Sequence, residues 1–193
     1  SSALSSVKAG ALGDGGNIKL TASSLFLTNG GQLEASTFGE GDSGNVSITA
    51  DNAVSLDSSS YILNNVQDIN AKGDAGKIDI TTGSLSATNG SQISSFTRGQ
   101  GNAGDITIQA TDAITFDGFD TDSNEFASSI ASSVQAGGIG DGGNIKITAD
   151  SLSLTNGGYL EVSVREARDK LSGGQGKGGN VNISVESTLT IAG

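Results

Sequence analysis

The stretch Gly140-Asp-Gly-Gly-Asn-Ile-Lys-Ile-Thr-Ala149 joins a glycine turn to residues that alternate between apolar and polar. Such alternation is typical of a half-buried β-strand. The same pattern occurs six times in the chain, at spacings of 28, 32, 28, 39 and 36 residues. Its first glycines are Gly13, Gly41, Gly73, Gly101, Gly140 and Gly176. Recurrence at such a period is the signature of a repeat protein.

Each repeat contains three short strand patterns. In the fifth repeat they cover residues 145–149, 152–154 and 159–162, and the turn Thr-Asn-Gly at 155–157 separates the last two. Equivalent residues in every repeat predict a parallel β-helix, or β-solenoid, of about six coils of three short strands. The coils start near residues 13, 41, 73, 101, 140 and 176, and residues 1–193 form a single domain. An antiparallel sandwich is the alternative, but that fold does not require equivalent residues in the corresponding strand of every repeat.

The first strand of each repeat supplies two columns of side chains that we expect to stack inside the solenoid. These columns are Ile18/Val46/Ile78/Ile106/Ile145/Val181 and Leu20/Ile48/Ile80/Ile108/Ile147/Ile183. Their members are all branched aliphatic residues of similar size, as close packing between successive coils requires.

The composition excludes several classes of site. The chain contains no His and no Cys, which excludes histidine-based catalysis, disulfides and thiolate metal sites. Its formal net charge is −11, so a phosphate backbone or an anionic membrane is a poor partner. No apolar run is long enough for membrane insertion. The chain also lacks Met, and we expect it to be a piece of a longer protein.

Two acidic features are candidates for binding Ca²⁺. In the acidic stretch 117–126, Asp120, Asp122 and Asn124 have the first spacings of an EF-hand loop, but Glu125 occupies the position that requires Gly. The alternative is a solvated loop whose two phenylalanines pack against the coil. The second feature is the turn column Asp14, Asp42, Asp74, Asn102, Asp141 and Lys177. Asp before Gly also suits a tight turn without any metal, so we expect no cofactor.

The segment Arg165-Glu-Ala-Arg-Asp-Lys-Leu171 is the densest basic cluster. We expect it to form one helical turn in a loop that departs from the repeat, where binding residues are often found. Arg165, Arg168 and Lys170 are candidates for contacting an anionic sugar or an acidic neighbour, together with Asp120, Asp122 and Glu125 in the other long loop. The alternative is that both loops are charged only because they are solvated.

The repeat resembles a known family. Residues 140–149, followed by Ser151-Leu-Ser-Leu-Thr-Asn-Gly-Gly-Tyr-Leu160, are similar to the repeats of filamentous-haemagglutinin-like exoproteins of two-partner secretion, most of all the large cyanobacterial type. The resemblance covers nearly the whole chain. It implies a right-handed parallel β-helix, export through an outer-membrane transporter, and a place on the outer surface of a Gram-negative-type cell. It implies no catalytic residues.

We therefore expect a non-catalytic, structural and adhesive stalk segment of a large secreted cell-surface protein. Its partners would be glycans, matrix or other cell surfaces, and exposed strand edges would favour end-to-end association. One alternative is an inert spacer that presents a distal toxin or adhesin tip. The other is an enzyme that acts on polysaccharides, because parallel β-helices also carry such activities. The adhesive stalk predicts direct binding by this chain, the spacer predicts no binding, and the enzyme predicts turnover of a polysaccharide.

Overall fold

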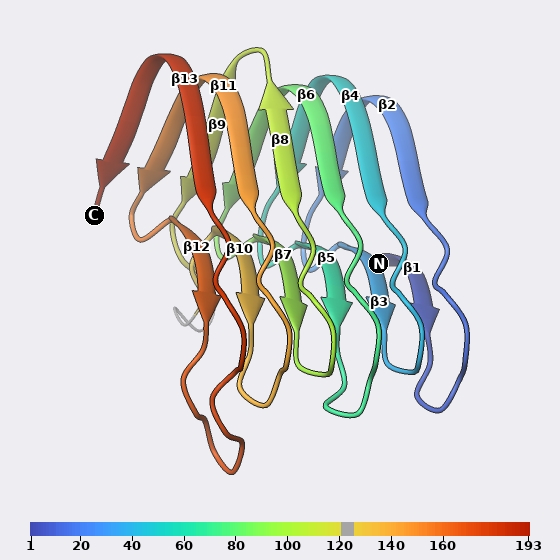
Figure 1. The fold of residues 1–193 in the computed structure, drawn as a ribbon. Coiled ribbons are helices and arrows are strands. Elements are labelled where there is room, and N and C mark those ends of the chain that lie inside the picture. The colour runs from blue at the N-terminus through green and yellow to red at the C-terminus, as the bar shows by residue number, and fades with distance from the viewer. Residues whose placement is uncertain (121–125) are drawn as a thin grey trace.

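The chain forms two parallel β-sheets that face each other across a narrow interior (Figure 1). The computed structural model describes residues 1–120 and 126–193. The strands are β1 Ser2–Val7, β2 Ile18–Leu27, β3 Gln32–Thr37, β4 Val46–Leu56, β5 Tyr61–Val66, β6 Ile78–Thr88, β7 Gln92–Thr97, β8 Ile106–Ala110, β9 Ala113–Asp117, β10 Ser129–Val134, β11 Ile145–Thr155, β12 Tyr159–Val164 and β13 Val181–Ala192.

Neighbouring strands in each sheet come from successive repeats. One sheet has the order β1-β3-β5-β7-β10-β12, and the other runs β13-β11-β8-β6-β4-β2, with β9 between β11 and β6. Every pairing between these strands is parallel. A chain that alternates between two such sheets is a parallel β-solenoid, as predicted, and the antiparallel sandwich is wrong.

The predicted division into three short strands is correct only where β8 and β9 are separate. In the other repeats of this sheet the first two expected strands form one long strand, such as β4, which bends where the register shifts between Ala50 and Ala53. Strand pairing with the adjacent coil resumes on both sides of the bend. A coil therefore contributes one long, bent strand and one short strand, except where β8 and β9 are separate.

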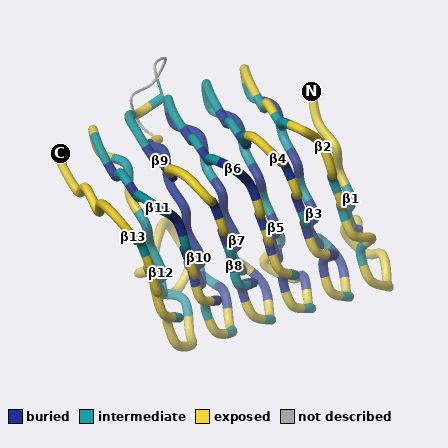
Figure 2. The backbone as a smooth tube through the Cα atoms, turned by 90° about the horizontal axis from the view of Figure 1, so that it is seen from above, coloured by how far each residue is buried: buried dark blue, intermediate teal, exposed yellow. Residues whose placement is uncertain are grey.

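The predicted interior columns are confirmed. Ile78 pairs with Val46 and Ile106, and Ile80 pairs with Ile48 and Ile108. These side chains are buried and pack with residues of the opposite sheet into one continuous core (Figure 2). Burial falls away at both ends, where β2 and β13 each lack a coil on one side. The expectation of end-to-end association remains a prediction.

The glycine turns allow the coils to approach closely. Gly101 has a φ of 142°, and a Cβ there would lie 1.9 Å from the carbonyl oxygen of Gly73. A Cβ on Gly104 would lie 1.8 Å from the carbonyl oxygen of Gly76. Both distances are far below van der Waals contact, so only glycine fits between the stacked turns.

The acidic turn column is a ladder of hydrogen bonds between coils. One side-chain oxygen of each Asp or Asn accepts the backbone N–H of the equivalent residue in the next coil, at 2.7 to 2.9 Å. Asp74, for example, accepts the N–H of Asn102. Lys177 supplies only its backbone N–H, as the last member. This role explains the column without an ion between the coils, and the expectation of no cofactor remains a prediction.

A second polar column lies inside the solenoid, and the sequence analysis did not predict it. Asn64, Ser95 and Ser132 occupy equivalent positions on β5, β7 and β10 and are fully buried. Their side-chain oxygens accept backbone N–H groups of the glycine turn: Asn64 from Gly76 at 3.0 Å and Ser95 from Gly104 at 2.7 Å. A buried N–H without a partner would be destabilising, so these residues satisfy groups that close stacking removes from water.

Candidate functional site

The outer face of the sheet that contains β7, β10 and β12 carries a shallow trough. Its floor is formed by Ser129, Ala131 and Ser133, which alternate along β10 and point away from the interior. Larger side chains on the flanking strands rise above this floor, among them Phe96 on β7 and Tyr159 on β12. The hollow has a volume of about 280 Å³. A strand of small residues between strands with larger ones therefore creates the trough.

Both loops that depart from the repeat border this trough. Phe126, at the end of the 117–126 stretch, lines it, and so do Arg165 and Arg168, which follow β12. The loop after β12 extends farther from the body than the other turns on that side (Figure 1). The two irregular segments are therefore brought to one face, although they lie far apart in the sequence.

Three arginines line the trough, and they are the only arginines of the chain. Arg98 and Arg165 directly follow β7 and β12, and Gln135 holds the same place after β10, as their backbone bonds to the preceding coil show. Successive coils are separated by about 4.8 Å, so the backbones of Arg98 and Arg165 are roughly 10 Å apart. Arg168 joins them from the loop. None of the described residues that line this trough is acidic.

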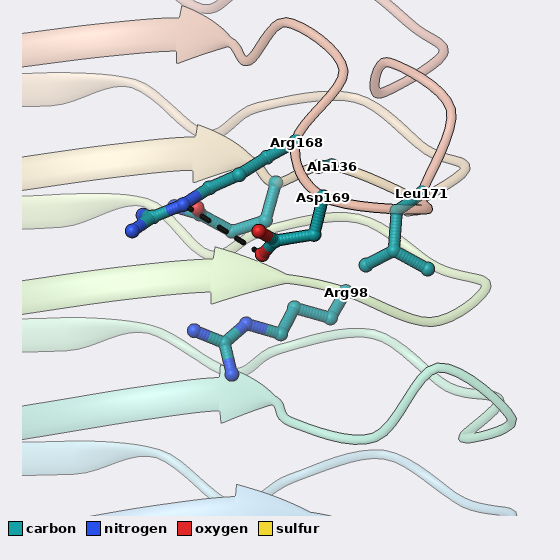
Figure 3. A pocket seen from close by; sticks show the side chains of 6 residues that line it. Arg98, Ala136, Arg168, Asp169 and Leu171 are labelled. Carbon is teal, nitrogen blue, oxygen red and sulfur yellow. Dashed lines mark ion pairs between the residues drawn. The ribbon is translucent and has the colours of Figure 1, made fainter.

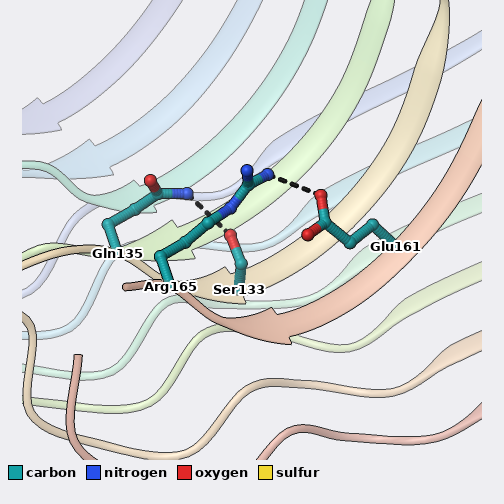
Figure 4. A network of polar contacts seen from close by, with 4 residues as sticks. All are labelled: Ser133, Gln135, Glu161 and Arg165. Carbon is teal, nitrogen blue, oxygen red and sulfur yellow. Dashed lines mark hydrogen bonds and ion pairs between the residues drawn. The ribbon is translucent and has the colours of Figure 1, made fainter. Parts of the chain in front are cut away.

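The three guanidinium groups differ in their partners. Arg165 forms an ion pair with Glu161 at 2.5 Å, while Gln135 donates to Ser133 at 2.7 Å (Figure 4). Arg98 lies over the ring of Phe96, with 5.1 Å to the ring centroid. Arg168 is 4.0 Å from Asp169, and both side chains are more than four-fifths exposed, so this pair contributes little. Arg98 and Arg168 thus remain available to an external anion.

The trough continues toward the loop end of the sheet. Two further hollows of about 370 and 320 Å³ share Gln135, Ala136 and Arg168 in their walls. In the larger one, Arg98 and Arg168 extend in the same direction, and Asp169, which is paired with Arg168, also lines it (Figure 3). The connected surface is open to solvent and is not an enclosed active-site cavity.

The candidate residues from the sequence have different outcomes. Arg165 and Arg168 line the trough, whereas Lys170 is exposed and is absent from the walls of all three hollows. The expected helical turn is wrong: Leu171 N–H donates to Arg168 O at 3.0 Å, and Asp169 has a φ of 56°, which makes a tight turn.

In the other loop, Asp120 lies over Gly90, and its N–H donates to the Phe126 carbonyl at 2.7 Å. Asp122 and Glu125 lie outside the described residues, so the EF-hand comparison is not tested. Across residues 1–120 and 126–193, no group of three or more acidic side chains is arranged to hold a metal ion. In the same part of the chain, no helix is long and apolar enough to cross a membrane.

Arg98 is the residue that the sequence analysis missed. It is an isolated cation in a regular repeat, so nothing near it in the sequence marks it. The available signal was its place directly after the third strand of its repeat, which it shares with Arg165 two coils later. Aligning the repeats on the third strand rather than on the glycine turn would have brought the two together.

A separate acidic position, Asp57, stabilises the turn between β4 and β5. Its carboxylate accepts hydrogen bonds from Thr88 at 2.8 Å, from Asn89 at 2.7 Å and from Ser58 at 3.0 Å. The bonds from Thr88 and Asn89 are the main cause that lowers the pKa of Asp57 below its usual value of 3.8. Asp117 repeats this arrangement with Thr155 and Asn156.

Asp57→Asn is expected to lower the free energy of unfolding at pH 7. The folded-state pKa of Asp57 lies below 3.8, so its contribution is complete above that value and is lost as the pH falls through the lowered pKa. Urea unfolding from pH 7 to pH 2 should show the difference from the parent chain shrinking at the acid end. Asp51→Asn, an exposed carboxyl on β4, is the control. A difference that does not change with pH would contradict the electrostatic explanation.

Comparisons with family models, curated proteins and solved structures find no match to this chain. The features that bear on function are therefore the parallel β-solenoid, the repeated sequence and the trough over β7, β10 and β12.

Proposed function

We propose that the chain is a stiff, non-catalytic shaft segment of a secreted cell-surface protein, and that one of its faces is adhesive. The observation that carries this proposal is the in-register pairing of equivalent residues through both sheets, from β1 to β12 and from β2 to β13. Each coil is held by its neighbours through backbone ladders, side-chain ladders and a continuous core. This nearest-neighbour architecture produces an extended rod.

We further propose that the rod is right-handed and contains about six coils. Strands that are parallel neighbours in one sheet are connected here through a strand of the other sheet. Connections between parallel strands of one sheet are right-handed in almost all proteins, which supports this hand. Six glycine turns stack on one another, from Gly13 to Gly176, which supports the number of coils.

The surface location and the export through an outer-membrane transporter are supported by the resemblance of residues 140–160 to filamentous-haemagglutinin-like repeats. The absence of Cys agrees with export of an unfolded chain. The open trough favours adhesion over the spacer alternative, because it collects the arginines of an acidic chain on one face. It also favours adhesion over an enzyme, since no acidic pair is among its described lining residues.

Antibodies raised against this chain test the surface role. Intact cells of the source organism should be labelled, and protease added outside the cells should remove the labelling. Antibody absorbed with the purified chain and antibody against a cytoplasmic protein are the two controls. Labelling that appears only after permeabilisation would overturn the proposal.

A further inference from the structure

We propose that the trough over β7, β10 and β12 binds a carboxylated polysaccharide, a polymer of uronic acid residues. The inference deepens the proposed adhesive role and rests on it. Three properties of the trough carry it: its charge, its exposed aromatic rings and its shape.

The central hollow of the trough is basic, unlike the molecule as a whole. The chain has 21 acidic and 10 basic residues, yet this hollow is lined by Arg98, Arg165 and Arg168 and by no acidic residue that the structure describes. Glu161 pairs with Arg165, and Glu166 and Asp169 lie in the walls of the adjoining hollows, so Arg98 and Arg168 are the cations that an external carboxylate would meet. Guanidinium groups bind carboxylates through paired, charge-assisted hydrogen bonds. A nucleic acid does not fit, because its dense row of phosphates would be repelled by the net charge of −11 on the remaining surface.

The aromatic rings point to a sugar rather than to a small anion. Phe126 and Tyr159 line the trough and are 50% and 36% exposed, and the half-buried Phe96 of β7 also lines it. An exposed ring gains free energy when an apolar surface covers it, and the C–H face of a pyranose ring provides such a surface. Free phosphate or sulfate ions offer no apolar face and would use only the arginines.

The shape of the trough fits a chain rather than a single sugar. It is open, it crosses the three strands, and it continues into two hollows that share Gln135 and Arg168. Arg98 and Arg165 occur two coils apart on the same column, with Gln135 between them as a neutral hydrogen-bonding group. Arg165 is paired with Glu161, so a polymer that carries regularly spaced carboxylates would contact Arg98 and Arg168 at once, and simultaneous contacts raise the apparent affinity.

The earlier coils contain no arginine, which limits paired guanidinium–carboxylate contacts to this part of the sheet. The two positions that precede Arg98 on its column are Phe38 and Gln67. Lys8 lies over the ring of Phe38, with 5.5 Å to the centroid, and no arginine is present in that part of the chain. The binding face therefore covers the two coils that carry the irregular loops and the coil of β7 beside them.

The test measures binding of the whole chain to polygalacturonate by isothermal titration calorimetry at low salt. Fully methyl-esterified polygalacturonate is the matched ligand control, because it keeps the sugar and removes the charge. The parent chain should bind the acid and not the ester, and affinity should fall as salt is raised. Arg98→Gln/Arg168→Gln should weaken binding about 100-fold, since each charge-assisted contact is worth roughly one factor of ten.

Lys19→Gln/Lys77→Gln is the matched protein control, because it removes the same charge from two exposed positions away from the trough, one on β2 and one in the turn before β6. It should bind nearly as tightly as the parent, and thermal melting should show that both double variants are folded. Equal loss of affinity in the two variants, or no binding by the parent chain, would overturn the proposal. Dextran sulfate binding without polygalacturonate binding would overturn the carboxylate assignment. Surface labelling of cells without uronate binding would leave the shaft role standing and remove only this inference.

Discussion

Ile80→Asp is expected to unfold the middle of the solenoid. Ile80 is 1% exposed and packs in a column between Ile48 and Ile108. A carboxylate there has no cation and no donor to offset its lost hydration, so we expect a cost of more than about 4 kcal/mol, a large fraction of the stability of an ordinary domain. Because each coil is stabilised by its neighbours, several coils should open together.

The measurement is hydrogen exchange combined with urea unfolding. Amide protection should be lost across β4, β6 and β8, and the unfolding midpoint should fall sharply. Thr81→Asp is the control: it places the same charge one residue later on β6, where the side chain is exposed. It should change the free energy of unfolding by no more than about 0.5 kcal/mol. If the two variants melted alike, the assignment of Ile80 to the interior would be wrong.

The interior columns could be predicted because two independent regularities agree on them. Alternation within residues 145–149 assigns alternate side chains to one face, and recurrence at equivalent places in every repeat selects the stacked register. Repetition is also visible in the turns, because Asn29, Asn89 and Asn156, each within a Thr-Asn-Gly turn, all have a positive φ. What repetition did not reveal is the boundary between the first two strands, because the bend in β4 leaves the hydrogen-bonded ladder intact on both sides.

The polar interior could not be predicted, because burial of Asn64 depends on the opposite side of the coil. A polar residue in an alternating strand is normally assigned to solvent. Here Asn64 accepts the N–H of Gly76, and its own Nδ2 donates to the Gly44 carbonyl at 2.7 Å. Its partners, Gly44 and Gly76, belong to glycine turns that lie next to β5 only in the folded solenoid.

The sequence pointed to two arginines of the trough but not to the trough itself, for a similar reason. Arg165 and Arg168 are prominent in the sequence because they lie in a charged loop that interrupts the repeat. Arg98 joins them through coil stacking, and the floor depends on the small size of Ala131 relative to its neighbours across the sheet. The trough is lined by residues from three coils, and their proximity can be recognised only when β7, β10 and β12 are placed in register.

Gly104→Ala is expected to separate two coils at the centre of the rod. The new Cβ would lie 1.8 Å from the Gly76 carbonyl oxygen and 2.8 Å from the Gly76 carbonyl carbon, and both belong to backbone held by its own ladder. Relief of this contact requires the turns to move apart. That movement weakens the bond from Gly104 N–H to Ser95 and the adjacent bond from Asn102 N–H to Asp74. We expect a loss of roughly 3 kcal/mol or more.

Gly16→Ala is the matched control, because Gly16 holds the same place in the first glycine turn, where no coil is stacked beneath it. Its Cβ would meet only the Ser5 hydroxyl, at 3.3 Å, and that side chain is free to rotate. Neither glycine has a positive φ. The two variants therefore differ in whether the new Cβ meets the backbone of an adjacent coil, and not in backbone strain. Gly16→Ala should remain within about 1 kcal/mol of the parent in urea unfolding. Equal effects of the two substitutions would show that glycine is needed for the turn itself, whereas a large effect at Gly104 alone assigns its role to the contact between coils.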